Sequence, residues 1–123
     1  APFFNLVVGV DTDRPAEDLH AMMRVIEDRQ GRVRSGASYS PRTLDLDVLT
    51  YGDQVTDAGG KHLPRGEITR YAFVLAPLAD VAPQERHPEL GRSYAELWAD
   101  YRGADRDSLQ RLELLPWNDE VTA

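Results

Sequence analysis

The 123-residue sequence contains no cysteine, which excludes disulfide bonds, thiolate metal sites and cysteine nucleophiles. Its three histidines, His20, His62 and His87, are far apart in the sequence, which argues against a metal site built from histidine. No apolar run approaches the roughly 18 residues of a membrane span. The first residues also lack the basic and apolar regions of a signal peptide. These absences favour a cytoplasmic protein with no membrane partner.

The net charge of −7 argues against nucleic acid as a partner, because a duplex-binding protein needs a basic face to neutralise phosphates. Arginines nevertheless gather between positions 24 and 42. This cluster is too small for a DNA footprint, but it suits a single polyphosphate, which arginine binds through paired hydrogen bonds.

The hydrophobic pattern predicts one domain, spanning residues 1–123, with an α+β layer fold in which helices pack on one sheet. The stretch 71–81 fits either a helix or a strand, and its alanines and leucines favour a helix that Pro77 kinks or ends. Ser93 and Glu96 have the spacing of a capping box. The predicted elements, in chain order, are strand 3–11, a helix from Pro15 to about Gln30, loop 31–42, strand 43–51, an edge hairpin at 54–63, a turn or short helix at 64–70, helix 71–81 and helix 93–101.

The second predicted strand carries two carboxylates, Asp45 and Asp47. Residues i and i+2 of a strand share one face and lie about 6.8 Å apart, so both side chains can reach the same hard cation. Magnesium prefers such oxygen ligands and combines them with substrate phosphates. The alternative is an ordinary solvated strand face, and the strand alone does not separate these two interpretations.

The residues upstream favour the magnesium interpretation. Arg32, Arg34 and Arg42 lie on a Gly- and Ser-rich segment that leads directly into the two aspartates. Arginines on such a loop can close over a polyphosphate, although each alone also fits an ordinary surface residue. Together with the aspartate pair, they predict a site for phosphoryl transfer.

Aromatic residues suggest a place for a flat heterocycle. Phe3 and Asn5 share one face of the first predicted strand, where a ring can stack and an amide can hydrogen-bond to a heterocycle edge. Phe73 is a second candidate. Each phenylalanine alone also fits the core.

Four blocks together resemble the 6-hydroxymethyl-7,8-dihydropterin pyrophosphokinase family of folate biosynthesis: 3–5, 32–34, 41–52 and 72–78. The similarity covers roughly residues 3–100, and the run Pro-Arg-Thr-Leu-Asp-Leu-Asp at 41–47 is its most specific part. The resemblance implies a ferredoxin-like α+β sandwich with helices on a mainly antiparallel sheet. It also implies magnesium-dependent transfer of pyrophosphate from ATP to the pterin hydroxymethyl oxygen, with release of AMP.

The resemblance further implies roles for individual residues. Two magnesium ions would be held by the two aspartates, and the nucleotide phosphates by basic residues and a threonine. Glu27 would support the site. In the sequence these residues are Asp45 and Asp47 for the metal, Arg32, Arg34, Arg42, Thr43, Arg65 and Arg70 for the nucleotide, and Phe3, Asn5 and Phe73 for the pterin. Of these, Arg32, Arg42, Asp45 and Asp47 would be catalytic.

The chain departs from the usual family pattern in the nucleotide site. Arg65 replaces a histidine, and Tyr71 replaces an arginine, with Arg70 displaced by one position. In the loop, 38–40 reads Ser-Tyr-Ser instead of Arg-Trp-Gly. These differences leave two alternatives to an active enzyme: a divergent paralogue that binds a pterin or nucleotide without the usual transfer, and a non-enzymatic interaction domain.

A second departure concerns the front of the domain. Family members have a strand, a helix and a further strand before the equivalent of Phe3, and this sequence starts at that point. We therefore expect the domain to be incomplete at its N-terminus and to be completed by the missing segment or another chain. Without that unit, the apolar residues Leu6, Val8 and Val10 are expected to be exposed.

Overall fold

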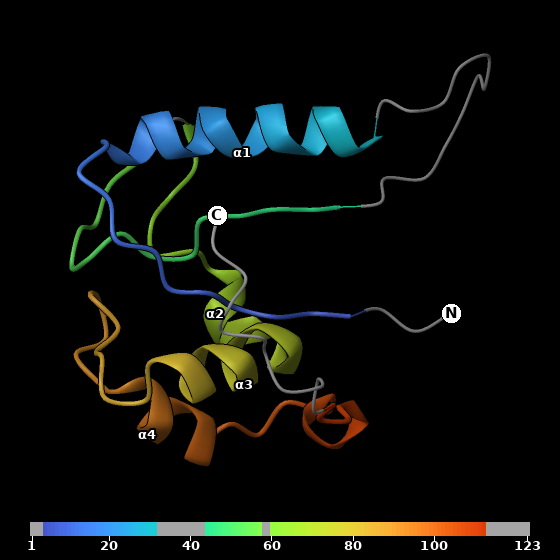
Figure 1. The fold of residues 1–123 in the computed structure, drawn as a ribbon. Coiled ribbons are helices and arrows are strands. Elements are labelled where there is room, and N and C mark those ends of the chain that lie inside the picture. Colours follow the sequence, from blue (N-terminus) through green and yellow to red (C-terminus); the bar gives the residue numbers. More distant parts are fainter. Residues whose placement is uncertain (1–3, 32–43, 58–59, 113–123) are drawn as a thin grey trace, which may run out of the picture.

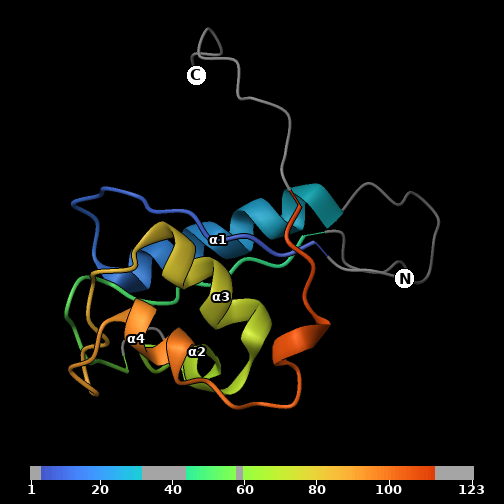
Figure 2. The same ribbon diagram turned by 90° about the horizontal axis from the view of Figure 1, so that it is seen from below.

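The structure is a computed structural model that describes residues 4–31, 44–57 and 60–112. In Figure 1, a long helix lies on one side of the molecule, the short helices lie on the other side, and two extended segments run between them. Seen from below in Figure 2, the short helices lie together on the near side. The elements of the described ranges are α1 (Ala16–Gly31), α2 (Glu67–Arg70), α3 (Ala72–Val81), α4 (Tyr94–Ala99) and the 3-10 helix η2 (Arg106–Ser108).

Helix α1 confirms the helix predicted from Pro15 to about Gln30. The carbonyl of Pro15 accepts the backbone N–H groups of Asp18 and Leu19, which starts the first turn. Acidic Glu17 and Asp18 lie in that turn and Arg29 lies in the last one, and both placements are favourable in the field of the helix dipole. None of the helices in the described ranges is long and apolar enough to cross a membrane.

Helix α3 confirms the helical interpretation of 71–81, but the expectation that it could end at Pro77 is wrong. The proline lies inside the helix, which continues to Val81. Leu78 and Ala79, the two residues after the proline, are buried. Burial of these apolar side chains outweighs the loss of one backbone hydrogen bond, as tertiary packing commonly does for a short helix.

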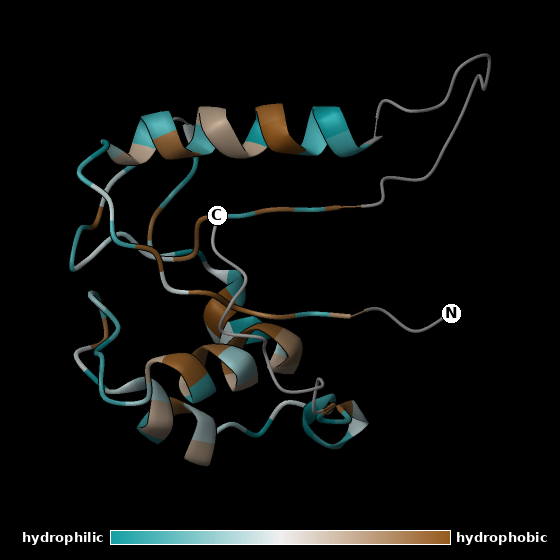
Figure 3. Ribbon diagram, viewed as in Figure 1, coloured by the Kyte–Doolittle hydropathy of each residue, from teal (hydrophilic) through white to brown (hydrophobic). Residues whose placement is uncertain are grey.

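The apolar core lies among α2, α3 and α4. Ile68 of α2 and Leu75 of α3 are almost completely buried, and Tyr94 and Tyr101 close the cluster from the α4 side. Helix α3 consists mostly of apolar residues, as its colouring in Figure 3 shows, and four of them are buried. The core positions α3, and therefore Phe73 in its first turn.

The two segments predicted as strands are extended but do not pair. We call residues 4–11 the apolar segment and residues 44–51 the aspartate segment. A strand needs the backbone of a neighbour to satisfy its N–H and C=O groups. Within the described ranges, backbone pairing is limited to isolated antiparallel bridges, Thr56 with Leu63 and Arg86 with Ser93. The strand predictions are therefore not confirmed, and the ferredoxin-like sandwich stays a prediction.

The apolar segment exposes the side chains that the sequence leads us to expect. Phe4, Leu6, Val8 and Val10 are 68–79% exposed. Figure 3 shows that much of this segment is apolar, with brown along most of its length. Val7 points the other way and packs against the core. Within residues 4–11 only Val7 is partly buried, so the segment contacts the core at one position and leaves its other apolar side chains exposed.

The predicted edge hairpin at 54–63 is reduced to one bridge. Thr56 and Leu63 exchange both backbone hydrogen bonds, at 3.0 and 2.7 Å. Residues 58–59 lie outside the described ranges. Two residues further on, the N–H of Arg65 donates to the carbonyl of Leu49 at 2.9 Å. This bond ties the chain after the hairpin to the aspartate segment.

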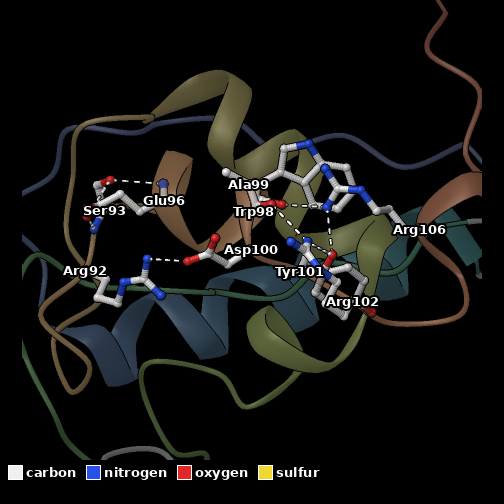
Figure 4. A network of polar contacts seen from close by, with 9 residues as sticks. All are labelled: Arg92, Ser93, Glu96, Trp98, Ala99, Asp100, Tyr101, Arg102 and Arg106. Atoms are coloured by element: carbon white, nitrogen blue, oxygen red, sulfur yellow. Dashed lines mark hydrogen bonds and ion pairs between the residues drawn. The ribbon is translucent and has the colours of Figure 1, made fainter.

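Helix α4 confirms the predicted capping box, although it ends at Ala99 and not at Tyr101 (Figure 4). The Ser93 hydroxyl accepts the backbone N–H of Glu96 at 3.1 Å, and the Glu96 carboxylate accepts the N–H of Ser93 at 2.9 Å. At the other end, the guanidinium of Arg106 lies 4.2 Å from the centre of the Trp98 ring. These contacts hold the tail of the described chain against α4.

His87 stabilises the turn before α4 as a neutral imidazole. Its buried ring accepts two backbone N–H groups at Nδ1, from Glu89 at 3.2 Å and from Leu90 at 3.1 Å. Burial lowers the pKa of His87, and Glu89 opposes this only in part. In the unfolded chain His87 has its ordinary pKa of about 6.5, and in the folded protein its pKa is lower. As the pH falls below about 6.5, the unfolded chain binds this proton first, so stability decreases.

We predict that His87→Leu lowers the free energy of unfolding by about 1–3 kcal/mol at pH 7.5, because two buried N–H groups lose their acceptor. His87→Asn keeps an acceptor oxygen and is expected to be milder. Urea unfolding at pH 7.5 and 5.5 checks both, and the asparagine variant should lose less stability between the two pH values than the wild type. An equal loss would contradict the role of His87. His20 and His62 titrate in both proteins, so the difference isolates His87.

Candidate functional site

The aspartate segment presents both carboxylates on its exposed side. Asp45 and Asp47 are exposed, whereas Leu44, Leu46 and Val48 are partly buried. The sequence predicts that Leu44, Leu46 and Val48 face one way and that Asp45, Asp47 and Leu49 face the other, and this alternation is confirmed for 44–48. It is wrong for Leu49, which is partly buried and packs against the core. The two carboxylates project from the same side of the chain into solvent.

A buried glutamate holds the backbone between the aspartates. The N–H of Leu46 donates to Oε2 of Glu27, on α1, at 2.6 Å. Glu27 is 8% exposed. Figure 1 shows the aspartate segment running beneath α1, which is what this bond requires. Because Leu46 lies between Asp45 and Asp47, the bond limits the orientation of both side chains.

Asp47 forms an ion pair that the sequence did not reveal. Nζ of Lys61 lies 3.2 Å from Oδ1 of Asp47, and both side chains are partly exposed. The pair joins residues fourteen positions apart, brought together by the turn before Leu63. No periodicity within either segment indicates this contact.

His20 of α1 lies within the electrostatic reach of this pair. The side chain is 8% exposed, and its Nε2 atom has no hydrogen-bond partner in the part of the chain that the structure describes. Burial lowers the pKa of His20, and the charges of Lys61, Arg24 and Arg65 lower it further, while Asp47 acts in the opposite direction. The imidazole is therefore neutral at pH 7 in a locally positive environment.

The two basic residues expected to substitute for missing family residues share one carboxylate. The guanidinium of Arg65 lies 2.6 Å from Oε2 of Glu67, and that of Arg70 lies 4.0 Å from Oε1 of the same residue. Burial acts to raise the pKa of Glu67, but hydrogen bonds from its own backbone and from Arg65 outweigh burial and lower the pKa. Glu67 is therefore a carboxylate at neutral pH and partly neutralises both arginines.

The aromatic part of the predicted site is partly exposed. Phe73 is 40% exposed and stacks on Tyr71, with ring centres 5.2 Å apart. The first turn of α3 is held by Asp105, whose Oδ2 accepts the N–H of Ala72 at 2.9 Å. Sequence reasoning identified Phe73 but missed Tyr71 as its stacking partner. The close spacing of two aromatics at i and i+2 was the signal that could have found it.

The remaining predicted residues differ in how far the structure describes them. Asn5 is exposed on the apolar segment. Phe3, Arg32, Arg34, Arg42 and Thr43 lie outside the described residues, and so does the stretch 38–40.

The protein side chains supply few ligands for a cation. Among residues 4–31, 44–57 and 60–112, no three histidine, aspartate or glutamate side chains converge as a metal-binding group. A magnesium site at Asp45 and Asp47 therefore needs ligands from water and substrate phosphates. This is the usual arrangement for magnesium, which dehydrates reluctantly.

We predict that Glu27→Leu weakens the aspartate site without removing a ligand from it. Loss of the acceptor leaves the Leu46 N–H without its bond to α1, so the two carboxylates lose their fixed spacing. Mn²⁺ affinity, measured by electron paramagnetic resonance, is expected to fall about ten- to a hundredfold, the range typical of second-sphere partners of metal ligands. Glu27→Gln, which keeps a carbonyl oxygen, should restore most of the affinity. Equal losses in the two variants would contradict a positioning role.

Two exposed carboxylates, one of them paired with a lysine, are a set of groups suited to binding phosphorylated ligands through a hard cation. Residues 1–83 match the model of the family described as 7,8-dihydro-6-hydroxymethylpterin-pyrophosphokinase (HPPK). The match extends over more than half of the 123 residues, and the chain belongs to this family.

Individual relatives agree with this assignment. The chain is 44% identical over 97 residues to a 2-amino-4-hydroxy-6-hydroxymethyldihydropteridine pyrophosphokinase of Pseudomonas aeruginosa, covering 79% of the chain and 59% of that protein. A protein of the same name from Synechocystis is 36% identical over 83 residues, covering 68% and 42%. A folate synthesis bifunctional protein of Chlamydia caviae is 33% identical over 93 residues, covering 76% and 21%. The chain thus spans about three fifths or less of the length of these relatives.

Proposed function

We propose that the chain carries the metal and phosphate part of a site that transfers pyrophosphate from ATP to 6-hydroxymethyl-7,8-dihydropterin and releases AMP. The observation that carries this proposal is the exposed pair Asp45 and Asp47, held at Leu46 by the buried Glu27. Membership of the pyrophosphokinase family and the names of the relatives support it.

The donor chemistry of the pair fits magnesium. Asp45 and Asp47 offer carboxylate oxygens only, and both are accessible to solvent. Hard cations prefer such ligands, and the accessible side leaves space for water and phosphate oxygens. When bound, magnesium ions supply neutralisation of the charge on the phosphate chain.

The transfer needs little covalent chemistry from the protein. A bond forms between the hydroxymethyl oxygen and the β-phosphorus, the bond from that phosphorus to the bridging oxygen of AMP breaks, and the hydroxyl loses its proton. The side chains therefore act mainly by positioning the two substrates and balancing charge. Phe73 and Asn5, together with Phe3, are proposed to hold the pterin. Arg32, Arg34, Arg42 and Thr43 are proposed to hold the nucleotide.

The sandwich of helices on a mainly antiparallel sheet remains part of the proposal. The extended course of the apolar and aspartate segments supports it, as does the alternation of burial along 44–48. The position of both segments between α1 and the short helices also fits two layers (Figure 1).

Chromatographic detection of AMP tests the proposal. The full-length protein is incubated with ATP and 6-hydroxymethyl-7,8-dihydropterin, with magnesium or with excess EDTA. We expect AMP and the pterin pyrophosphate to form in equal amounts, and only with magnesium. Formation of ADP instead of AMP, or no product at any magnesium concentration, would refute the transfer.

One observation favours a second candidate, a paralogue that binds the ligands without efficient transfer. Arg65 and Arg70, which would replace the missing histidine and arginine of the family pattern, both face Glu67. A carboxylate between two cations reduces the charge available to the nucleotide. Calorimetry with a non-hydrolysable ATP analogue separates the candidates: binding without AMP formation identifies the paralogue.

A further inference from the structure

The ion pair between Lys61 and Asp47 places a cation directly on one of the two carboxylates proposed to bind magnesium. Their charged atoms lie 3.2 Å apart, and the side chains are 28% and 39% exposed. An ammonium at this distance neutralises the carboxylate. A divalent cation that binds Asp47 would meet this ammonium and repel it.

The charged groups around His20, which include both members of this ion pair, are mostly positive. The charged groups that act on the buried His20 are Lys61, Arg24 and Arg65 on the positive side and Asp47 on the negative side. This locally positive region lies in a protein whose net charge is −7. Three cations and one carboxylate within electrostatic reach of one imidazole leave a net positive charge there, which suits an anionic ligand.

The chemistry of lysine fits movement between two partners. Its ammonium is a compact charge with three donors on a flexible four-carbon stem, and it binds phosphate as a point charge. A side chain that is 28% exposed has room to move.

We propose that Lys61 is the counter-ion of Asp47 in the unliganded protein, and that its ammonium moves to the nucleotide phosphates when a divalent cation takes its place. Lys61 thereby becomes a phosphate-binding residue of the site and supplies a positive charge from a position that the sequence pattern did not indicate. The nucleotide part of this inference rests on the proposed function.

Lys61→Met tests the exchange, because it keeps the length of the side chain and removes its charge. Mn²⁺ binding without nucleotide, followed by electron paramagnetic resonance, is expected to tighten about two- to fivefold, since one partly exposed ion pair no longer competes. Binding of a non-hydrolysable ATP analogue with magnesium, measured by calorimetry, is expected to weaken about tenfold, since one charged contact to phosphate is lost.

Opposite changes in the two affinities support the proposal. If Lys61 is merely structural, the substitution should weaken both affinities, and if it has no role, both affinities should stay unchanged. Either of these results overturns the proposal. Lys61→Arg keeps the charge and should leave both affinities near those of the wild type. Arg111→Met removes one positive charge from the ion pair with Asp80 and serves as the matched control, with no expected change. Unfolding curves of all variants confirm that each one folds.

Asp47→Asn separates the failure of this inference from failure of the proposed function. If the asparagine variant binds Mn²⁺ as the wild type does, the metal site itself is wrong. If it loses Mn²⁺ while Lys61→Met changes neither affinity, the metal site stands and the exchange by Lys61 is refuted.

Discussion

Asp47→Asn is expected to lower the rate of AMP formation by about 10²–10³-fold, the effect typical of removing one group that stabilises developing charge in a transition state. The carboxylate is exposed, and its neighbour Leu46 is held by Glu27, so the substitution removes one charge of the proposed metal site and leaves the backbone contact in place. The measurement is AMP release at saturating ATP and pterin over a range of magnesium concentrations. Higher magnesium should restore part of the rate, because weakened metal binding is the cause.

The fold should tolerate this substitution. Asp47 makes a partly exposed ion pair, and such pairs contribute at most about 1 kcal/mol to stability. Asp53→Asn is the matched control, since Asp53 is exposed in the turn that follows the aspartate segment and loses the same charge. We expect it to keep the wild-type rate. Comparable losses from both substitutions would show a general effect of charge and contradict the metal site.

Leu75→Ala is expected to lower the free energy of unfolding by about 2–5 kcal/mol, because removal of a fully buried leucine side chain leaves a cavity in the core. Leu75 is 1% exposed, in the middle of α3, and belongs to the cluster that joins α2, α3 and α4. Against a typical total of about 5–15 kcal/mol, this is a large fraction of the stability. Urea unfolding followed by circular dichroism measures the change.

Val81→Ala provides the comparison on the same helix. Val81 is 48% exposed at the end of α3, and its truncation should change stability by no more than about 0.5 kcal/mol. Similar losses for the two variants would mean that α3 does not pack through Leu75. If Leu75→Ala does not fold, the conservative Leu75→Val gives a smaller loss that still exceeds that of Val81→Ala.

The sequence predicted helices well where the determining residues lie within the helix or at its first turn. The capping box of α4 needs only Ser93 and Glu96 at the correct spacing, and it forms as expected. Pro77 shows the limit of such signals: proline disfavours a helix interior, yet burial of Leu78 and Ala79 carries α3 past it. A local preference of a few kcal/mol yields when the core gains more from packing.

The predicted site shows the same division. The alternation along 44–48 was sufficient to predict that Asp45 and Asp47 share an exposed side. The stacking of Tyr71 on Phe73 could have been anticipated from their spacing, but it was not. Strand pairing was not confirmed for the apolar and aspartate segments, because a strand prediction from one segment cannot include the partner backbone that a sheet requires.

By itself, the sequence determined the family, the positions of the helices and the two carboxylates that make a metal site plausible, because each of these depends on residues close together in the chain. Only the tertiary structure decided that Glu27 holds Leu46, that Glu67 lies between two arginines and that Lys61 neutralises Asp47. The contacts of Glu27 and Lys61 join residues nineteen and fourteen positions apart. Contacts of this kind follow from how α1, the aspartate segment and the bridge at Thr56 and Leu63 pack together, and no local pattern contains that information.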